Sequence, residues 1–339
     1  MNFEEKGFYK GIRLFLFISF LSITVILLTT VSKETKKGLQ LISPLFIGIT
    51  LLSSSFSQFF NIWRLRYIIK AMGKNLSWSG SFYYTIGGAF LGGITPFQVG
   101  GIPLQLYLCK RENITIPEAS VAIFTRGLLS ALVLPLLIPL IYYYRVYFTK
   151  GIIQGIIKYV SIFYGLLVLL LIFALLKTEW FIKKLKGNFF KGILEFKEVL
   201  GKEFFKRKKD FSKAYILTAI SLFFNFLIAF FLIRGLGVGV DFIKATVIQI
   251  ILTYALAFMP TPGASGLAEG SAYGLFKELM PQSILGVYVI LWRFFTGYLW
   301  MIIGGFSLTR LFSKLRKKQK LSYDEPQPLK QHKGQNQLR

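Results

Sequence analysis

The sequence predicts an all-α polytopic membrane protein with about six full transmembrane helices and two re-entrant broken-helix hairpins in an inverted-topology repeat. The 339-residue chain is 54% hydrophobic, and its repeated apolar runs are long enough for helices to cross a bilayer. Basic residues, which give a net charge of +26, gather in loops and tails, as is typical of cytoplasmic segments of membrane proteins. A Pro-containing motif interrupts one apolar run in each half of the chain, as in transporters built from internal repeats.

Apolar segments follow one another along the chain with basic stretches between them. They occupy residues 12–31, 40–62, 82–108, 119–144, 151–176, 214–233, 244–278 and 284–311. The basic stretches at 63–81, at 177–213 and after 311 should all be cytoplasmic. The N-terminal apolar run resembles a signal peptide, but no small-residue cleavage site follows it, so we expect it to remain as the first helix.

The number of apolar segments between the basic loops predicts the two hairpins. Three segments separate loop 63–81 from loop 177–213, and an odd number of crossings cannot return the chain to the same side. Segment 82–108 is rich in Gly and Pro, which continuous helices tolerate poorly, so we expect it to enter and leave by the cytoplasmic face. The same count makes 244–278 a hairpin that opens to the outside. Alternatively, both segments are ordinary kinked spans, and the count of basic loops is off by one in each half.

These assignments divide the chain into two membrane repeats and a tail. The boundaries are 1–145 for the first repeat with its cytoplasm-facing hairpin 82–110, 146–312 for the second repeat with its outside-facing hairpin 244–278 and cytoplasmic amphipathic loop 178–212, and 313–339 for a basic, polar and disordered cytoplasmic tail. The amphipathic loop either recruits anionic lipid or is a solvated linker. We therefore expect a multi-pass protein of the cell (plasma) inner membrane with both termini in the cytoplasm.

The motif that occurs in both halves is the main functional signal. Its first copy, Thr95 to Gly100, reads Thr-Pro-Phe-Gln-Val-Gly, and its second, Thr261 to Gly266, reads Thr-Pro-Gly-Ala-Ser-Gly. Unwound backbone inside a bilayer leaves polar groups without partners, but it also offers N–H groups and half-helix N-termini to an anionic ligand. Alternatively, the Gly and Pro residues only allow close helix packing. The motif residues expected to bind substrate are Thr95, Pro96, Gln98, Gly100, Gly101, Thr261, Pro262, Gly263 and Gly266.

Two arginines follow the motifs inside the next apolar segments. Arg126 lies 30 residues after Pro96, and Arg293 lies 31 residues after Pro262. A charge at membrane depth is costly, and an arginine cannot deprotonate to avoid that cost. We expect the pair to be phosphate ligands that bind substrate, one for each access state. The alternative is that they snorkel to the membrane surface or cap carbonyl groups of the hairpins.

Glu269 is an acidic residue within an apolar stretch, directly after the second motif. A carboxylate at membrane depth must pair with a cation or take up a proton. We therefore expect either an ion pair with Arg293 or Arg126, or a proton-coupling site. Five amide side chains could line the same polar path, namely those of Asn61, Gln58, Gln98, Gln105 and Gln249.

The composition argues against several other kinds of site. The single cysteine, Cys109, excludes a disulfide within the chain, and the single histidine, His332, lies in the polar tail. We therefore expect no His or Cys metal cluster, no cofactor and no catalytic residue. A hydrophobic chain with basic loops also argues against nucleic acid as a partner. The expected partners are a membrane lipid substrate and anionic lipids of the inner leaflet, and the sequence is compatible with an oligomer.

Two stretches of the chain resemble the transmembrane region of lysylphosphatidylglycerol synthases, a family that includes stand-alone flippase-like membrane proteins. The first is 92–107 followed by Pro117-Glu118-Ala119 and Arg126, and the second runs from Pro260 to Gly270 and on to Arg293. The resemblance covers about residues 10–312. The family usually has an acid just before the proline that follows the first motif, whereas this chain has Ile102 there, which leaves the lipid and the chemistry of the first hairpin open.

The resemblance implies a flippase-like transporter that moves an anionic or aminoacylated phospholipid, or a polyprenyl-phosphate lipid, between leaflets. Two alternatives are a phosphatidylglycerol lysyltransferase-type enzyme and a membrane partner subunit in lipid modification. Family members that aminoacylate lipids carry a large soluble domain, and only about 27 residues follow the last apolar segment here, too few for such a fold. We therefore expect no enzyme activity from this chain by itself.

Overall fold

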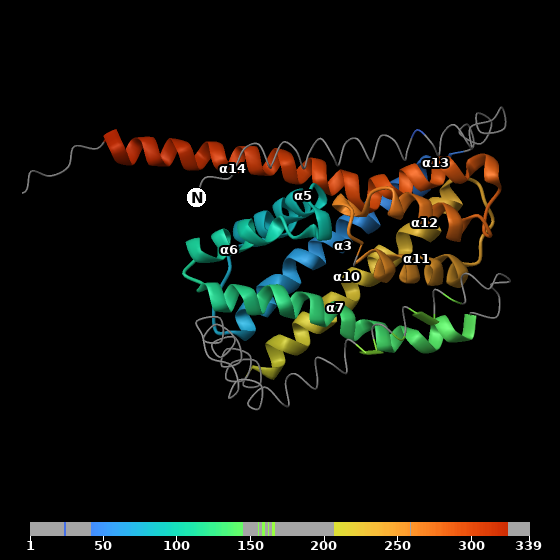
Figure 1. Ribbon diagram of the computed structural model, residues 1–339, viewed down its shortest axis with the longest axis horizontal. Helices are drawn as coiled ribbons and strands as arrows, with labels where there is room; N and C mark the ends of the chain where they lie inside the picture. Colours follow the sequence, from blue (N-terminus) through green and yellow to red (C-terminus); the bar gives the residue numbers. More distant parts are fainter. Residues whose placement is uncertain are drawn as a thin grey trace, which may run out of the picture.

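The computed structural model describes residues 42–144, 207–257 and 259–324, with a few single residues outside these ranges. Every regular element within them is helical, with no strand (Figure 1). Four helices are long and apolar enough to cross a membrane: Pro44–Ala71, Ile116–Tyr143, Lys208–Gly235 and Gln282–Lys314. Most of the predicted spans 12–31 and 151–176 and residues 178–206 of the predicted loop lie outside the described residues. The expectation of about six full spans therefore stays a prediction.

The elements follow the predicted apolar segments closely. In chain order they are α3 (Pro44–Ala71), α4 (Trp78–Phe82), the π-helix η1 (Tyr83–Gly87), α5 (Gly88–Gly93), the 3-10 turn η2 (Pro96–Gln98), α6 (Gly101–Arg111), α7 (Ile116–Tyr144), α10 (Lys208–Gly235), α11 (Phe242–Leu256), the 3-10 turn η5 (Pro262–Ala264), α12 (Leu267–Phe276), α13 (Gln282–Arg293), the π-helix η6 (Phe294–Tyr298) and α14 (Leu299–Asp324).

Helices α3 and α10 pack against each other in opposite directions along their whole length, through the middle of the molecule. Ser43 N–H, before α3, donates to the carbonyl of Gly235 at the end of α10 (2.8 Å). Near the centre the Ser221 hydroxyl donates to the Ser57 carbonyl (2.8 Å). Small hydroxyl side chains let the two backbones approach closely, as in packed membrane helices.

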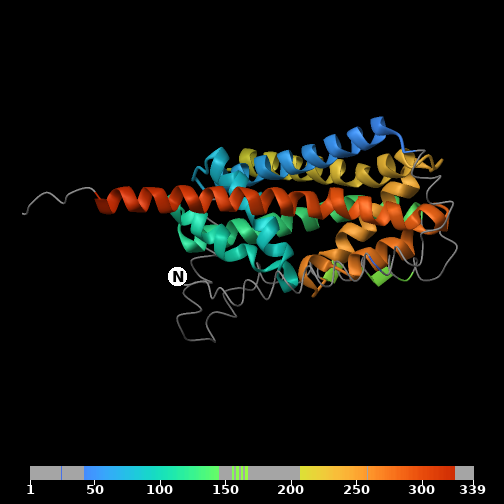
Figure 2. The same cartoon turned by 90° about the horizontal axis from the view of Figure 1, so that it is seen from above.

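Two broken hairpins flank this helix pair. In the first, α4, η1 and α5 lead to the η2 turn and α6 leads back, whereas in the second α11 leads to the η5 turn and α12 leads back. The hairpins occupy opposite ends of the molecule, and their η2 and η5 turns contact each other in the middle (Figures 1 and 2). We call these two turns the first tip and the second tip.

The first hairpin begins and ends at the same place. Glu112, which follows α6, accepts hydrogen bonds from Ser77 N–H and the Ser77 hydroxyl, both at 2.6 Å, and Ser77 immediately precedes α4. Lys74 of the preceding loop also pairs with Glu118 at the start of α7 (3.4 Å). The chain therefore leaves this hairpin beside the point where it entered.

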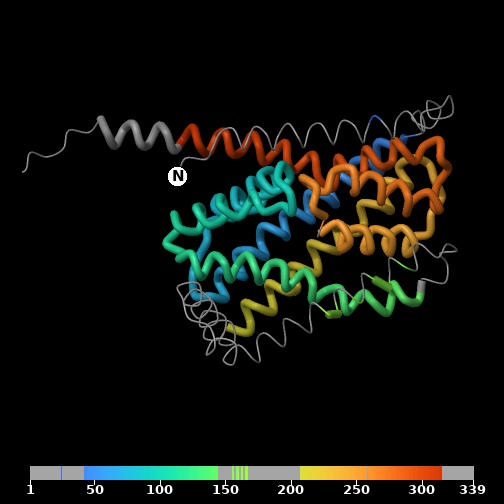
Figure 3. Tube along the Cα trace, in the orientation of Figure 1, coloured from blue at the N-terminus to red at the C-terminus, as the bar shows by residue number. Residues whose placement is uncertain are grey.

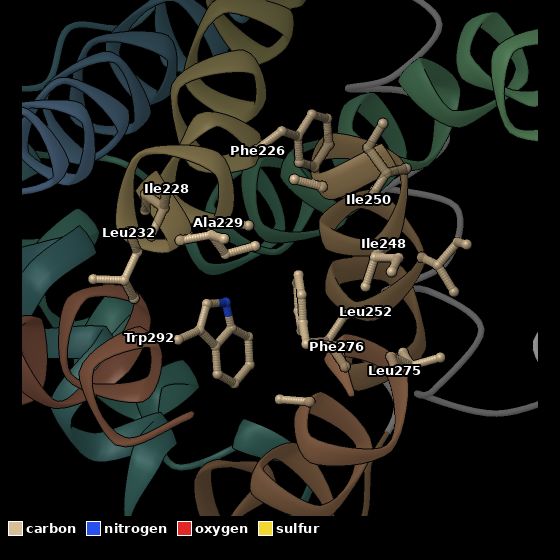
Figure 4. Packing of buried hydrophobic residues seen from close by; sticks show 14 of the residues in the cluster. Phe226, Ile228, Ala229, Leu232, Ile248, Ile250, Leu252, Leu275, Phe276 and Trp292 are labelled. Carbon is tan, nitrogen blue, oxygen red and sulfur yellow. The ribbon is translucent and has the colours of Figure 1, made fainter. Parts of the chain in front are cut away.

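Each hairpin has its own apolar core, and the two cores share helices from both halves of the chain. The core of the second hairpin combines α10, α11, α12 and α13, with Phe276 and Trp292 facing side chains from α10 and α11 (Figure 4). Leu134 and Ile141 of α7 also belong to it. The core of the first hairpin includes Leu308 of α14, and Figure 3 shows α13 and α14 passing along both hairpins. The two halves are interleaved, because the last helix of each packs on the hairpin of the other.

Two predicted boundaries differ from the structure. The predicted loop 63–81 is helical as far as Ala71, because Leu65, Ile68 and Ile69 continue the buried face of α3 between the basic residues. The predicted tail 313–339 begins within α14, which extends to Asp324. The residues from 313 to 324 include no Gly or Pro and many with good helix propensity, so the helix continues beyond the apolar segment.

Candidate functional site

The two tips share an unusual backbone conformation. Phe97 and Gly263, which occupy the same position in the two motif copies, have φ values of 52° and 56°. The next residues, Gln98 and Ala264, have φ values of 58° and 59°. Side-chain-bearing residues rarely adopt this left-handed conformation, so the two motifs are related in structure as well as in sequence.

Hydrogen bonds of Thr95 and close glycine contacts hold the first tip. The Thr95 hydroxyl donates toward the carbonyls of the preceding turn and accepts a bond from Gly100 N–H (2.8 Å). A Cβ on Gly101 would lie 2.7 Å from the carbonyl oxygen of Gly88, so only glycine allows α6 to pack this closely on α5. The residues from Pro96 to Val99 are exposed, and Phe97 has 62% of its surface accessible.

A charged network holds the second tip. Arg293 donates from Nε to Glu269 Oε1 (3.1 Å) and from Nη2 to the carbonyl of Gly263. The other carboxylate oxygen, Oε2, accepts Gly266 N–H (2.6 Å) at the start of α12, and Tyr298 donates its hydroxyl to Oε1 (2.8 Å). Glu269 is completely buried. The carboxylate thus balances the charge of Arg293, and the expected pairing of Glu269 with an arginine is present.

A π-helix brings two of these groups to the same carboxylate. Arg293 immediately precedes η6, and Tyr298 is the last residue of η6. The wider π-helical turn brings side chains five residues apart toward one side, and the Arg293 guanidinium lies over the Tyr298 ring, 5.4 Å from its centroid. A Cβ on Gly297 would lie 3.3 Å from Arg293 Nη1, so the glycine leaves room for the guanidinium.

Arg126 has different surroundings. Its Nη2 donates to Asn61 Oδ1 (3.3 Å), and the same oxygen accepts a bond from Arg64 Nε (2.9 Å). Arg64 Nη1 also donates to the hydroxyl of Ser130 (2.9 Å), one helical turn after Arg126 on α7. Within the described part of the chain, neither arginine has an acidic partner or a bond to the first tip. The first half of the protein therefore contains two arginines that share one neutral acceptor.

The sequence offers a reason for this difference between the halves. Glu269 lies 24 residues before Arg293, and the residue 24 positions before Arg126 is Ile102. Counted from the motif copies instead, the related residue is Pro103, so by either count the first half has no acid that corresponds to Glu269. Among the residues that the structure describes, no group of three or more His, Cys, Asp or Glu side chains could hold a metal ion.

Comparison with known proteins places the chain in a family. The model of the lysylphosphatidylglycerol synthase TM region matches residues 13–304. The chain belongs to this family. The membership confirms the resemblance that the two motifs predicted, and it identifies a membrane protein of a lipid-related family. The curated relatives include a UPF0104 membrane protein of Archaeoglobus fulgidus, which is 21% identical over 271 residues, covering 74% of this chain and 82% of the relative. No solved protein structure matches the chain.

The amides that the sequence suggested for one polar path in this family member lie in separate places. Asn61 and Gln58 bond to each other beside the arginines (3.2 Å), whereas Gln98 is exposed at the first tip. Gln249 accepts a bond from Trp292 (2.7 Å) in the core of the second hairpin. Gln105 is buried, and its side chain lies against Gly88.

Sequence reasoning missed Arg64, because the residue lies in a stretch whose positive charge indicated a loop. Only 7% of its surface is exposed. Leu65, Ile68 and Ile69 carry the signal that could have placed it in a helix, since they continue an apolar face at helical spacing.

Proposed function

We propose that this protein moves a lipid with an anionic headgroup between the two leaflets of its membrane. Such a lipid could be an anionic or aminoacylated phospholipid or a polyprenyl phosphate. Membership of the lysylphosphatidylglycerol synthase TM region family supports a lipid substrate. The observation that carries the proposal is that two equivalent tips meet with the same backbone conformation but unequal exposure. Gln98 of the first tip is exposed, whereas Ala264, at the same position of the second tip, is 2% exposed.

Unequal exposure of related tips is what alternating access requires. In the proposed mechanism, the first hairpin enters the membrane from the cytoplasm and the second enters from outside. Opening one tip while closing the other would give the headgroup access to each side in turn, with the acyl chains remaining in the lipid. Membrane transporters built from inverted repeats bind substrate at such broken helices and exchange access by moving one repeat against the other. In this mechanism, the conformation described here, in which the first tip is exposed, corresponds to the state with that tip open.

A proteoliposome assay tests the proposal. The full chain is reconstituted with fluorescent phosphatidylglycerol, and movement of the labelled lipid between leaflets is followed with a quencher that cannot cross the bilayer. We expect translocation above that of protein-free liposomes. Gly263→Val should reduce it strongly, because a β-branched residue cannot adopt φ of 56° without strain.

Gly274→Val is the matched control. Gly274 lies in α12 of the same hairpin, and a Cβ there would meet nothing within 4 Å. This variant should translocate lipid at the parent rate. The proposal would be abandoned if the parent protein moved neither phosphatidylglycerol nor its lysyl derivative nor a polyprenyl phosphate faster than empty liposomes.

A further inference from the structure

We infer that Arg64 and Arg126, together with Asn61 and Tyr84, form a single binding site for a phosphate group. This inference rests on the proposed function and gives it a location, because the phosphate of a lipid headgroup is the ligand that these residues would hold. The site combines α3, η1 and α7, and it lies in the first half of the protein.

Arg64 is buried and Arg126 is partly buried, and neither has the charge balance that a buried arginine requires. Buried charges in proteins are paired, and an uncompensated one is strongly destabilising. Here two guanidinium groups converge on the neutral Oδ1 of Asn61, and the described residues place no carboxylate beside them. Two like charges kept together without a counterion indicate a site whose missing charge comes from a ligand.

The arginines also keep most of their hydrogen-bonding capacity. Within the described part of the chain, their bonds to Asn61 and Ser130 occupy three of ten guanidinium N–H groups. Phosphate oxygens accept several such donors at once, often in bidentate pairs with arginine. The two guanidinium groups can therefore bind one phosphate together while both remain bonded to Asn61.

A buried hydroxyl gives independent support. Tyr84 is completely buried in η1, and its hydroxyl has no hydrogen-bond partner. It lies within electrostatic range of both Arg64 and Arg126. A second unpartnered hydroxyl belongs to Thr125, the residue before Arg126. Leaving a buried hydroxyl unpaired is costly, whereas a phosphate oxygen beside the arginines would accept a hydrogen bond from the Tyr84 hydroxyl.

The second half of the protein does not repeat this site. Arg293 is already neutralised by Glu269 and bonded to the carbonyl of Gly263. The first half has no acid at the related positions, which are Ile102 when counted from the arginines and Pro103 when counted from the motif copies. The sequence predicts that Arg126 and Arg293 each bind phosphate, one in each access state. We instead place the anion at one site and assign Arg293 to holding the second tip closed.

Binding and unfolding of the full chain in uncharged detergent test this site. The probes are dihexanoyl phosphatidylglycerol and inorganic phosphate, each titrated at low salt. Arg64→Gln and Arg126→Gln should each weaken binding by about tenfold or more, the range expected for losing a charged hydrogen bond. Tyr84→Phe should cause a smaller loss. Arg66→Gln is the matched control on the same helix, since Arg66 bonds the Leu76 carbonyl and stacks on Trp78 instead.

A second measurement separates a binding role from a structural one. Without any anion, Arg64→Gln should unfold at the same temperature as the parent or higher, because it removes an uncompensated buried charge. Parent-like affinity in both Arg64→Gln and Arg126→Gln would overturn the inference. A lower unfolding temperature with unchanged affinity would overturn it too, and would make the arginines structural.

The outcomes also separate this inference from the proposed function. If binding depends on Arg64 and Arg126 but the protein moves no lipid in proteoliposomes, the phosphate site is supported and the transport proposal is overturned. Translocation at the parent rate by the double variant Arg64→Gln/Arg126→Gln supports transport and overturns the site. Inorganic phosphate that binds as tightly as the lipid supports the site and assigns its ligand to the free anion.

Discussion

At the residue scale, Glu269 shows how one carboxylate can organise a break in a helix. It caps the start of α12, balances the charge of Arg293 and accepts the Tyr298 hydroxyl, all without contact with solvent. The first motif makes a similar turn with the hydroxyl of Thr95 and close glycine contacts, without a charged group. The two tips therefore share a backbone conformation but depend on chemically different supports.

Glu269→Gln is expected to destabilise the protein severely. The amide keeps the shape of the side chain but leaves the buried Arg293 without a counterion, which costs about 3–5 kcal/mol in comparable cases. Thermal unfolding in detergent measures the effect. Glu278→Gln, on the same hairpin but outside the network, should change stability by less than about 0.5 kcal/mol.

Adding Arg293→Gln to Glu269→Gln distinguishes loss of charge balance from loss of packing. The double variant should recover part of the stability, since it removes the unpaired charge as well. If the double variant were as unstable as the sum of the single ones, the two residues would not act as a pair.

At the element scale, glycine contacts hold α14 against the first hairpin. A Cβ on Gly304 would lie 2.3 Å from the carbonyl oxygen of Ile86, a backbone atom of η1. The close approach fixes α14 beside the π-helix that carries Tyr84. In this way a helix from the end of the chain supports the proposed phosphate site near its beginning.

Gly304→Ala should therefore separate α14 from η1. We expect a loss of about 1–3 kcal/mol in stability, the usual cost of overpacking, together with weaker phosphatidylglycerol binding. Gly127→Ala is the control, because a Cβ there meets nothing within 4 Å and alanine favours helices. Unfolding temperature and lipid titration measure both effects, and a parent-like Gly304→Ala would contradict the packing argument.

The sequence predicted some elements well and others poorly, for physical reasons. The long apolar segments became α3, α7, α10 and α13–α14, because hydrophobic length is a local property, although α3 and α14 extend well beyond the predicted ends at 62 and 311. The sequence predicted either an ion pair of Glu269 with an arginine or a proton-coupling site, and the structure contains the ion pair with Arg293. The position of Arg64 was not predicted, since a charge on a buried helical face looks like a charge in a loop. The different exposure of the two tips depends on contacts between distant segments, which no local pattern reports.

At the scale of the whole molecule, the helices that the structure describes in the two halves are interleaved. Helices α3 and α10 run antiparallel with Ser57 and Ser221 in contact near the centre, and each hairpin packs against the last helix of the other half. This arrangement agrees with the proposed inverted repeat. It also makes a clear prediction about which loops share a side of the membrane.

Single-cysteine labelling tests the orientation. In a Cys109→Ala background, cysteines at Asn75 and Arg111, which flank the first hairpin, should react with an impermeant maleimide from the cytoplasmic side. Cysteines at Gly239 and Lys277, which flank the second hairpin, should react from outside. All four positions are exposed. Labelling of positions 75 and 111 from opposite sides would show that the first hairpin is an ordinary span.

The Glu269 network occurs at only one tip, and this has a kinetic consequence. Exposing the second tip would break a buried ion pair and the surrounding hydrogen bonds, whereas the first tip is already exposed without any such rupture. In the proposed mechanism the two arrangements therefore differ in energy, and we expect the unloaded protein to rest with its first tip open. For a protein that works as proposed, release of the second tip would be the slowest step of a cycle, and warming would accelerate turnover steeply.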